Sequence, residues 1–309
     1  MDVIGIGALN FDKLYFVDKI ARGGEEVAII GAMEAPGGSS ANTIVGLARL
    51  GLKTGFIGKV GNDEEGEFIL DDLKKEGVDL GGIEKSEGMT GVIIGLIDKR
   101  GERALYANPG VNDTLRMDKR AIMYAKKAKF LHLASFVGER SYKAQIELLE
   151  ELSNVGISFA PGMLYAKKGL NELELMIDKT SVLFLNRRET ELLTGWDYRK
   201  GAENLVELGA EIVAVTLGKE GCYITSPDGY HFVKAYPTKV VDTTGAGDAF
   251  ATGFLYGLIT EEDLKTCGKL GNWVASKCIE KEGAREGLPY NKDMKEFWKK
   301  GSYNSSFKL

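Results

Sequence analysis

A stretch near the C-terminal end of the chain has residues that suit the handling of a phosphate group. Gly245-Ala246-Gly247 and Asp248 stand between a β-rich run over 231–241 and an apolar helical run over 249–259. Glycine allows a tight turn and a close approach to backbone amides, and amides at the start of a helix attract anions. A carboxylate beside that turn can take a proton from a hydroxyl while the turn stabilises a transferring phosphoryl group. The stretch therefore predicts phosphoryl transfer with Asp248 as base, and a plain capping role for Asp248 is the simpler alternative.

Catalytic sites based on histidine or cysteine have little support in the sequence. The two histidines, His132 and His231, are far apart in the sequence, and His132 lies in an apolar run typical of a buried strand. The three cysteines, Cys222, Cys267 and Cys278, lack the close spacing of a metal site and suit a reducing compartment. Catalysis must then rest on carboxylates, backbone amides and a bound metal.

The composition is that of an ordinary soluble protein with a large core. The 309 residues are 44% hydrophobic and 28% charged, with a net charge of −5, which predicts one large domain with a small appendage. The acidic excess argues against a nucleic-acid partner, because phosphate backbones require clustered Lys and Arg. No apolar run is long enough to span a bilayer, and the N-terminus has no basic leader segment. We therefore predict a cytoplasmic protein with no membrane partner.

The elements that must position these residues alternate regularly over most of the chain. Residues 2–9 predict a buried strand, and helices are expected from 37–42 to about residue 50 and over 64–76. From residue 117 onward, helices are expected near 118–126, 141–154, 189–195, 201–208, 249–258, 261–280 and 291–299, and strands near 129–134, 156–160, 181–185, 211–216, 221–225 and 230–234. Such alternation predicts an α/β fold with a doubly wound, mostly parallel sheet.

Two pairs of short strands interrupt this alternation. The runs 14–20 and 26–33 have no helix between them, and the runs 90–96 and 103–107 are joined by a hairpin signal at 98–101. We expect these strands to form a small separate sheet. The predicted organisation is a large α/β domain of residues 1–13, 34–88 and 109–300, a small β lid of residues 14–33 and 89–108, and a tail of residues 301–309.

Two signatures in the correct order resemble those of a known family. The run Asp-Thr-Thr-Gly-Ala-Gly-Asp over 242–248 resembles the C-terminal signature of the ribokinase (PfkB) family of carbohydrate and nucleoside kinases. The segments 37–51 and 56–66 resemble its N-terminal signature, and the resemblance spans about residues 3–289. It implies a ribokinase-like fold, a phosphotransferase with an alcohol group as acceptor, and a small sheet that covers the sugar. Because that sheet often mediates dimerisation in the family, a homodimer through the lid is also expected.

The resemblance implies roles for residues that bind the nucleotide donor. Asp248 matches the catalytic base, and the turn before it, Gly245, Ala246 and Gly247, matches the anion hole. The Asn-x-x-Glu element places Asn186 near the phosphates and lets Glu189 order Mg²⁺ through water, as suits an ion that keeps several waters. The other matching positions beside the nucleotide are Thr216, Gly218, Gly221, Asn272 and Ser276. Asp242 and Thr244, with the loop 281–284, match a site for a monovalent cation such as K⁺ in many relatives.

The resemblance also implies roles on the acceptor side. Asp12 matches the aspartate that binds a sugar diol, which suits a carboxylate because it accepts two hydroxyl donors, and Gly38 and Asn42 match contacts to the same hydroxyls. Asn108 lies at the return of the lid, and Arg103 lies within it. Many sugar kinases have Asp-x-Asn-x-Arg where this chain has Phe-Ala-Pro-Gly-Met over 159–163. This departure argues against a hexose or keto-sugar acid and favours a ribosyl acceptor.

Several functions remain open on the sequence alone. The first is a Mg²⁺-dependent kinase that transfers a phosphoryl group from a purine nucleotide, ATP or ADP, to a primary hydroxyl of a nucleoside or ribose-type sugar. A lid arginine, Arg100 or Arg103, is able to bind a phosphate already on the substrate, so a sugar phosphate such as ribose 1-phosphate is an alternative. A non-catalytic sugar- or nucleotide-binding protein is a further alternative. A nicotinamide-dependent dehydrogenase fits poorly, because the segment 5–10 lacks the third glycine of a dinucleotide fingerprint.

Overall fold

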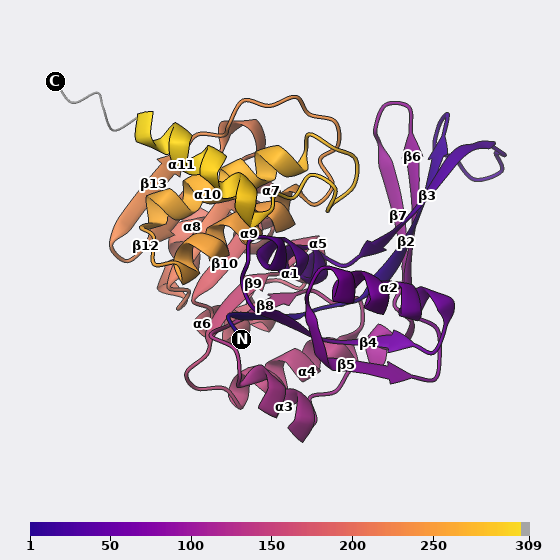
Figure 1. The fold of residues 1–309 in the computed structure, drawn as a ribbon, viewed down its shortest axis with the longest axis horizontal. Coiled ribbons are helices and arrows are strands. Elements are labelled where there is room, and N and C mark those ends of the chain that lie inside the picture. The colour runs from indigo at the N-terminus through magenta and orange to yellow at the C-terminus, as the bar shows by residue number, and fades with distance from the viewer. Residues whose placement is uncertain (304–309) are drawn as a thin grey trace.

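A nine-stranded sheet forms the centre of the protein (Figure 1). The structure is a computed structural model that describes the backbone of residues 1–303 and the side chains of residues 1–299. The strands lie in the order β13-β12-β11-β10-β9-β8-β1-β4-β5, with parallel pairing from β5 to β11 and antiparallel pairing of β12 and β13. Their bounds are β1 (Val3–Ile6), β4 (Thr54–Gly61), β5 (Asp79–Ser86), β8 (Phe130–Ala134), β9 (Gly156–Ala160), β10 (Val182–Asn186), β11 (Ile212–Thr216), β12 (Cys222–Ser226) and β13 (Gly229–Val233).

Helices cover both faces of this sheet. Successive side chains of a strand point to opposite faces, so Ile4 packs into one apolar core and Val3 into another. The core around Ile4 includes α3 (Lys119–Ala125), α4 (Glu139–Glu150), α5 (Gly162–Ala166), α6 (Leu170–Asp178), α7 (Arg187–Thr194) and α8 (Tyr198–Glu207). The core around Val3 includes α1 (Ser39–Arg49), α2 (Glu64–Lys75), α9 (Ala246–Ile259) and α10 (Leu264–Cys278). This confirms the predicted doubly wound, mostly parallel sheet.

A second sheet of four strands projects from one end of the molecule (Figure 1). Its order is β3-β2-β6-β7, with β2 (Asn10–Val17), β3 (Ile29–Gly37), β6 (Gly91–Asp98) and β7 (Arg103–Asn108). The pairs β2–β3 and β6–β7 are antiparallel, and β2 runs parallel to β6. The predicted small separate sheet is therefore present, and we refer to it as the lid sheet. Its first strand begins at Asn10 and its second ends at Gly37, so both extend beyond the range 14–33 that the sequence predicted.

The other elements agree with the expected pattern apart from a few boundaries. Each strand and helix expected from residue 117 onward is present, whereas α5 and α6 were not predicted, because such short helices depend on packing more than on local sequence. The β-rich run over 231–241 forms a strand only as far as Val233. Helix α11 (Met294–Tyr303) includes the first residues of the predicted tail, and residues 304–309 lie outside the described residues. Three short 3₁₀ turns, η1 (Gly110–Thr114), η2 (Gly218–Glu220) and η3 (Asn291–Asp293), complete the described chain.

Some sequence expectations concern isolated residues. His132 is buried and its Nδ1 lies 2.8 Å from Ser158 Oγ, as expected for a hydrogen-bonded core histidine. Cys222, Cys267 and Cys278 are all buried and free. Among the described residues, no helix is both long and apolar enough to cross a membrane. No cluster of three or more His, Cys, Asp or Glu side chains suited to a metal occurs in the described part of the chain.

Candidate active site

The first turn of α9 places Asp248 at the carboxyl end of the main sheet. The helix begins after Gly245, whose φ of 73° is in the left-handed region that glycine adopts without strain. A side chain at this position would also collide with Ala284, since an added Cβ would lie 2.6 Å from the Ala284 Cβ. Asp248 follows three residues later, beside the exposed Gly247. The turn therefore has the geometry that the sequence predicted for an anion hole with an adjacent carboxylate.

Helix α1 holds the Asp248 carboxylate from the opposite side. Ser39 Oγ donates to Asp248 Oδ1 at 2.6 Å, and Asn42 Nδ2 donates to Asp248 Oδ2 at 2.9 Å. The two helices are in close contact because Gly46 of α1 faces Thr252 of α9, where an added Cβ would lie 2.6 Å from the threonine hydroxyl. The position of the carboxylate is thus fixed by two helices that are far apart in the sequence.

The surroundings of Asp248 have opposite effects on its acidity. Burial raises its pKa, whereas the hydrogen bonds from Ser39 and Asn42 and the positive charge of Arg285 lower it. The net direction is upward from the ordinary aspartate value. A carboxylate with a raised pKa is a better proton acceptor, which suits a general base.

A cavity of about 650 Å³ opens beside Asp248. It brings together the predicted phosphate-side residues Asn186, Glu189, Thr216, Gly218, Ala246, Gly247 and Asp248. Asn186 ends β10, and Thr216 ends the adjacent parallel strand β11, opposite Asn186 in the register. Parallel strands place such residues at one edge of the sheet, where ligands of open α/β folds bind. These seven residues were predicted from three separate motifs, and the fold brings them to one cavity.

A second cavity of about 770 Å³ adjoins the first and shares Thr216, Gly218, Ala246, Gly247 and Phe250 with it. Its lining is more apolar and includes Gly221, Tyr236, Pro237, Asn272 and Ser276. Asn272 Nδ2 donates to the Val233 carbonyl at 3.0 Å, and Ser276 Oγ donates to the Trp273 carbonyl at 2.7 Å. These two side chains line one cavity, and their polar groups also hold the surrounding backbone, while their assignment to the purine stays a prediction.

Glu189 faces the first cavity from a capping box at the start of α7. Its Oε2 accepts from the Asn186 amide at 2.9 Å, and Asn186 Oδ1 accepts from the Glu189 amide at 2.8 Å. Burial raises the pKa of Glu189, and the nearby charge of Asp248 raises it further. Its second carboxylate oxygen makes no hydrogen bond to the described residues. One carboxylate beside a cavity with room for nucleotide phosphates fits a Mg²⁺ ion that is held mainly by phosphate oxygens and water.

Asp242 and Thr244, the residues matched to a monovalent-cation site, bind each other and the lid sheet. Asp242 Oδ2 accepts from the Gly283 amide at 2.9 Å, and Oδ1 accepts from the Thr244 amide at 3.0 Å. The guanidinium of Arg103, from β7, donates to both Asp242 Oδ1 and Thr244 Oγ1. These donors lower the pKa of Asp242 to about 2. With Arg103 in this place the carboxylate has its full set of donors, so a bound monovalent cation stays a prediction that requires Arg103 to move.

The acceptor-side residues surround Asp12 at the start of the lid sheet. Asp12 Oδ1 is buried and has no hydrogen-bond partner in the described structure, and burial raises its pKa to about 7. Gly37 leaves room for this side chain, because an added Cβ would lie 2.3 Å from both Asp12 oxygens. Gly38 has a φ of 111° and packs on the Ala8 carbonyl, so its role is set by the backbone.

Asn42 and Asn108 are less available to an acceptor than the sequence suggested. The Asn42 amide lies between Asp248 and Arg285, whose Nε donates to Asn42 Oδ1 at 2.8 Å. Asn108 Oδ1 accepts from the Gly110 amide at 3.1 Å at the start of η1. Asn108 also lines a small cavity of about 100 Å³ that Asn10 and Asn112 share. Their assignment to the acceptor stays a prediction.

Sequence reasoning missed three side chains of this site: Ser39, Asp72 and Arg285. Ser39 stands beside predicted residues, and its position at the start of α1 was the only available signal. Arg285 directly follows the loop 281–284 that was matched to the cation site, yet nothing in its local sequence indicates burial. Asp72 was predicted only as part of an amphipathic helix, and it pairs with Arg285 across 213 positions of the chain.

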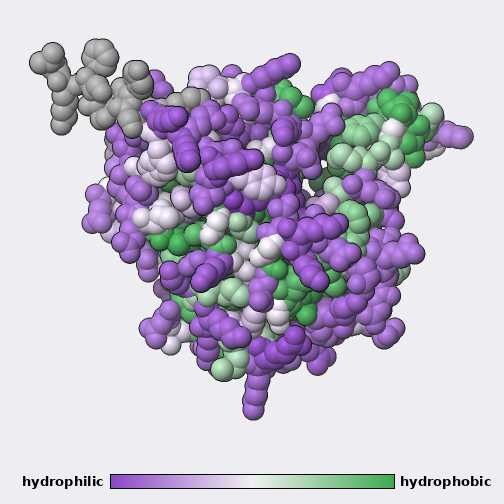
Figure 2. Space-filling model, viewed as in Figure 1, coloured by the Kyte–Doolittle hydropathy of each residue, from purple (hydrophilic) through white to green (hydrophobic). Residues whose placement is uncertain are grey.

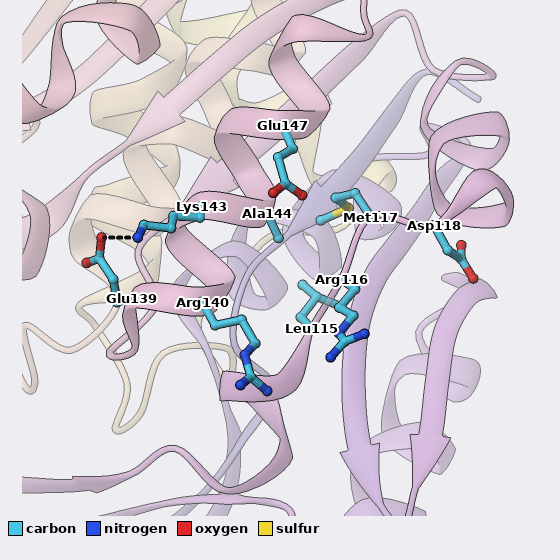
Figure 3. A pocket seen from close by; sticks show the side chains of 9 residues that line it. All are labelled: Leu115, Arg116, Met117, Asp118, Glu139, Arg140, Lys143, Ala144 and Glu147. Atoms are coloured by element: carbon cyan, nitrogen blue, oxygen red, sulfur yellow. Dashed lines mark ion pairs between the residues drawn. The ribbon is translucent and has the colours of Figure 1, made fainter.

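Another cavity of about 630 Å³ lies away from Asp248 (Figure 3). It is lined by residues 115–118 and by α4 from Glu139 to Glu147, where Glu139 pairs with Lys143 at 3.9 Å. Arg116 and Arg140 are both exposed there. None of the predicted site residues lines this cavity, so the candidate chemistry belongs to the two cavities at Asp248.

The comparison with protein families agrees with this geometry. The family model for the pfkB family carbohydrate kinase matches residues 2–291. The chain belongs to the PfkB family of carbohydrate kinases. PfkB proteins are phosphotransferases with an alcohol group as acceptor, which confirms the predicted class of enzyme.

Individual relatives are similar over most of their length. An uncharacterized sugar kinase of Archaeoglobus fulgidus is 48% identical over 252 residues, which are 81% of this chain and 100% of the relative. An ATP-dependent ribose-1-phosphate kinase of Halopiger xanaduensis is 33% identical over 92% of this chain and 93% of the relative. The solved structure of a ribokinase from Thermotoga maritima superimposes with a TM-score of 0.87 at 24% identity, over 97% of this chain and 99% of that chain. The last comparison confirms the ribokinase-like fold.

Proposed function

We propose that this PfkB protein transfers a phosphoryl group from a purine nucleotide to a primary hydroxyl of a ribosyl compound, with Asp248 as general base. The observation that carries the proposal is the place of the Asp248 carboxylate. Ser39 and Asn42 hold it at 2.6 and 2.9 Å, beside the glycine turn that opens α9 and at the edge of a cavity of about 650 Å³. A carboxylate that served only as a helix cap would need neither of these side chains.

The reaction follows from these contacts. The acceptor hydroxyl oxygen forms a bond to the terminal phosphorus, the bond from phosphorus to the nucleotide oxygen breaks, and the hydroxyl proton passes to Asp248. The backbone amides of Gly247 and Asp248, which start α9, would face the charge that spreads over the phosphoryl oxygens, whereas the Ala246 amide donates to the Thr243 carbonyl within the turn. Mg²⁺, when bound, would neutralise part of that charge, and Glu189 is the residue placed to orient its water ligands. The cavity lined by Asn272 and Ser276 is the proposed site of the purine.

A sugar phosphate such as ribose 1-phosphate is the second candidate acceptor. The Halopiger xanaduensis relative is named as a ribose-1-phosphate kinase that uses ATP. Arg103 supports the same substrate, because its guanidinium reaches from the lid sheet to the loop next to the anion turn. A guanidinium can bind a phosphate with two parallel hydrogen bonds. Binding of such a substrate would then exchange Asp242 for the substrate phosphate as the partner of Arg103.

We also propose that the lid sheet forms a homodimer. Its strands expose Ile29, Ile30, Leu105 and Tyr106 by 56% to 62%, and Figure 2 shows hydrophobic surface gathered over this part of the molecule. Exposed apolar side chains of this kind are typical of interaction sites. Association of two lid sheets would remove these side chains from water.

A phosphoryl-transfer screen tests the proposed function. ATP and ADP are offered separately with Mg²⁺, and the acceptors are nucleosides, ribose, ribose 1-phosphate, fructose phosphates and inositol. Turnover of a ribosyl acceptor that is lost in Asp248→Asn supports the proposal. Turnover of hexose phosphates alone would contradict the ribosyl assignment, and binding of nucleotide without turnover of any acceptor would favour a non-catalytic binding protein.

A further inference from the structure

Arg285 is a buried cation on the loop that follows α10. The residue is only 7% exposed, and its Nη1 donates to Asp72 Oδ2 of α2 at 2.5 Å. Its Nε donates to Asn42 Oδ1 at 2.8 Å, and its Nη2 has no hydrogen-bond partner in the described structure. A buried charge costs free energy unless it is paired and hydrogen-bonded. Asp72 supplies the charge that pairs with Arg285. The bond from Arg285 to Asn42 is therefore not needed for charge pairing.

The backbone of this loop is held independently of the Arg285 side chain. Arg49 of α1 donates through Nη1 to the Arg285 carbonyl at 2.5 Å and pairs through Nη2 with Glu76 of α2 at 2.6 Å. Gly287 packs against the end of α10, where an added Cβ would lie 2.3 Å from the Lys277 carbonyl. Arg49 therefore offers a matched control, because it anchors the same loop without touching Asn42.

The guanidinium of Arg285 decides which way the Asn42 amide points. The oxygen and nitrogen of an asparagine amide have nearly the same shape, and either end can occupy a given place. Arginine has only donors, so the amide oxygen must face Arg285 Nε. The amide nitrogen then faces Asp248 Oδ2 at 2.9 Å as a donor. With the amide reversed, two oxygens would face each other at Asp248, and the carboxylate would lose one of its two side-chain donors.

We infer that Arg285 is a positioning residue for the phosphoryl-transfer reaction, which acts through Asn42 to fix the orientation of the Asp248 carboxylate. The inference rests on the proposed function, since it takes Asp248 as the base. Arg285 lies on the far side of Asn42 from Asp248, so it touches neither the base nor the cavity of about 650 Å³ beside it. Its effect is on the geometry and the charge of the base.

The charge of Arg285 gives this role a signature in the pH dependence. Arg285 lowers the pKa of Asp248, and the other ionisable groups that act on this site are Glu189 of α7 and Cys278 of α10. Arg285 itself faces Asp72 and Glu76 of α2, Asp12 of β2 and Arg49 of α1. Removal of the positive charge disfavours the ionised form of Asp248, so its pKa rises. Turnover requires the ionised base, so the acid limb of the rate profile moves to higher pH.

Two substitutions separate orientation from charge. Arg285→Lys keeps the positive charge for Asp72 but loses the planar fork, and we expect kcat to fall by up to about 10²-fold, as a misplaced catalytic group does, with the acid limb nearly unchanged. Arg285→Met removes both the positive charge and the planar guanidinium, so kcat falls and the acid limb of the pH–rate profile moves to higher pH. The KM for the nucleotide stays within about two-fold in both, because neither change reaches that cavity. If Arg285→Met does not fold, Arg285→Met with Asp72→Asn removes the buried pair together and takes its place.

Arg49→Gln is the control for loosening of the loop, and Asp248→Asn is the control for the proposed function. Arg49→Gln is expected to lower the melting temperature without moving the acid limb. An unchanged kcat and acid limb in folded Arg285→Met would overturn the inference, as would an equal shift in Arg49→Gln. Full activity in Asp248→Asn would instead contradict the proposed function, and the two failures are therefore distinguishable.

Discussion

The nucleotide side and the acceptor side of the site are built differently. The proposed nucleotide side consists of two joined cavities of about 650 and 770 Å³, in which Asn272 and Ser276 already hydrogen-bond to protein groups. The proposed acceptor side adjoins a cavity of only about 100 Å³ and contains a buried polar atom, Asp12 Oδ1, that has no partner in the described structure.

On the proposed function, this difference separates donor binding from the choice of acceptor. Donor binding would then rely on backbone turns and a sheet edge that are already formed. A buried polar atom without a partner is costly, and an acceptor hydroxyl that bonds to it recovers that cost. We therefore expect substitutions on the nucleotide side to change rates for every acceptor, and substitutions on the acceptor side to change which acceptor is used.

The largest expected effect is at the border between the two sides. Asp248→Asn removes the proposed base and should lower kcat by roughly 10²–10⁴-fold for every acceptor, as loss of a general base does. Steady-state kinetics with the best acceptor measures it. Asp228→Asn, on the exposed turn between β12 and β13, is the matched control. Activity within a few-fold of the parent enzyme in Asp248→Asn would show that the base lies elsewhere.

A smaller effect is expected at Glu189. Glu189→Gln keeps an oxygen that accepts from the Asn186 amide but loses the charge, so the turn stays intact while Mg²⁺ binding weakens. Activity should fall by about 10–100-fold at low Mg²⁺ and recover partly at high Mg²⁺, in the range found for residues that orient metal ligands. Glu191→Gln, exposed on the same helix, should leave the Mg²⁺ titration unchanged. Identical titrations for both variants would remove Glu189 from the metal site.

The acceptor side should respond to pH through Asp12. Burial raises its pKa to about 7, so in the free enzyme the group is mainly neutral below pH 7 and ionised above it. The ionised form accepts hydrogen bonds from both hydroxyls of a diol, so the KM for the acceptor should fall several-fold from pH 6 to pH 8. The KM for the nucleotide should not show this change between pH 6 and pH 8. In Asp12→Asn the acceptor KM should be high and independent of pH, and a persistent pH dependence there would assign it to another group.

Arg103 connects the two sides and should control the response to K⁺. Its guanidinium places a positive charge on Asp242, so we expect little stimulation of the parent enzyme by K⁺. Arg103→Met frees the carboxylate, and K⁺ should then stimulate activity by a few-fold, in the range of a single modest coupling energy. Arg100→Met is the control, because Arg100 pairs with Asp98 within the hairpin at 3.3 Å. Equal K⁺ stimulation in parent and variant would exclude this role of Arg103.

The smallest effect on chemistry is expected from the outer face of the lid sheet. Tyr106→Lys places a charge in the exposed apolar surface, on the face of the lid sheet opposite to Asp12 and Arg103, and should convert the proposed dimer to a monomer with little change in kcat. Light scattering after size-exclusion chromatography measures the mass. Phe232→Lys, on the exposed strand β13, should leave the mass unchanged. A monomeric parent protein at micromolar concentration would contradict the proposed dimer.

Local patterns in the sequence predicted much of the fold and of the nucleotide side. The period of the apolar residues marks the strands and helices from residue 117 onward, and Asn186, Glu189, Thr216 and Gly218 each lie at the end of a strand or directly after it. Because parallel strands end at one edge, these residues were bound to lie together, as they do in one cavity. The two family signatures added the order of the parts.

The contacts around the base could not be predicted in this way. Arg285 meets Asn42 across 243 positions and Asp72 across 213, and neither local pattern shows which charged residue is buried. The extra length of β2 and β3 has a similar cause, since their pairing from Asn10 with Gly37 depends on the partner strand. Whether a polar side chain is buried depends on the packing of the whole domain and not on the local sequence.

The three buried thiols allow the opening of the native structure to be measured by chemical modification. Burial raises the pKa of Cys222, Cys267 and Cys278 to about 12 each, so almost no reactive thiolate exists while the native packing holds. Alkylation must then wait for an opening fluctuation, and its rate measures how often that opening occurs. Cys278 lies 3.7 Å from the Thr244 carbonyl and 3.4 Å from the Ala284 carbonyl, on the loops that flank the glycine turn. Slower alkylation of Cys278 in the presence of nucleotide would show that the donor reduces opening of the loops around the glycine turn.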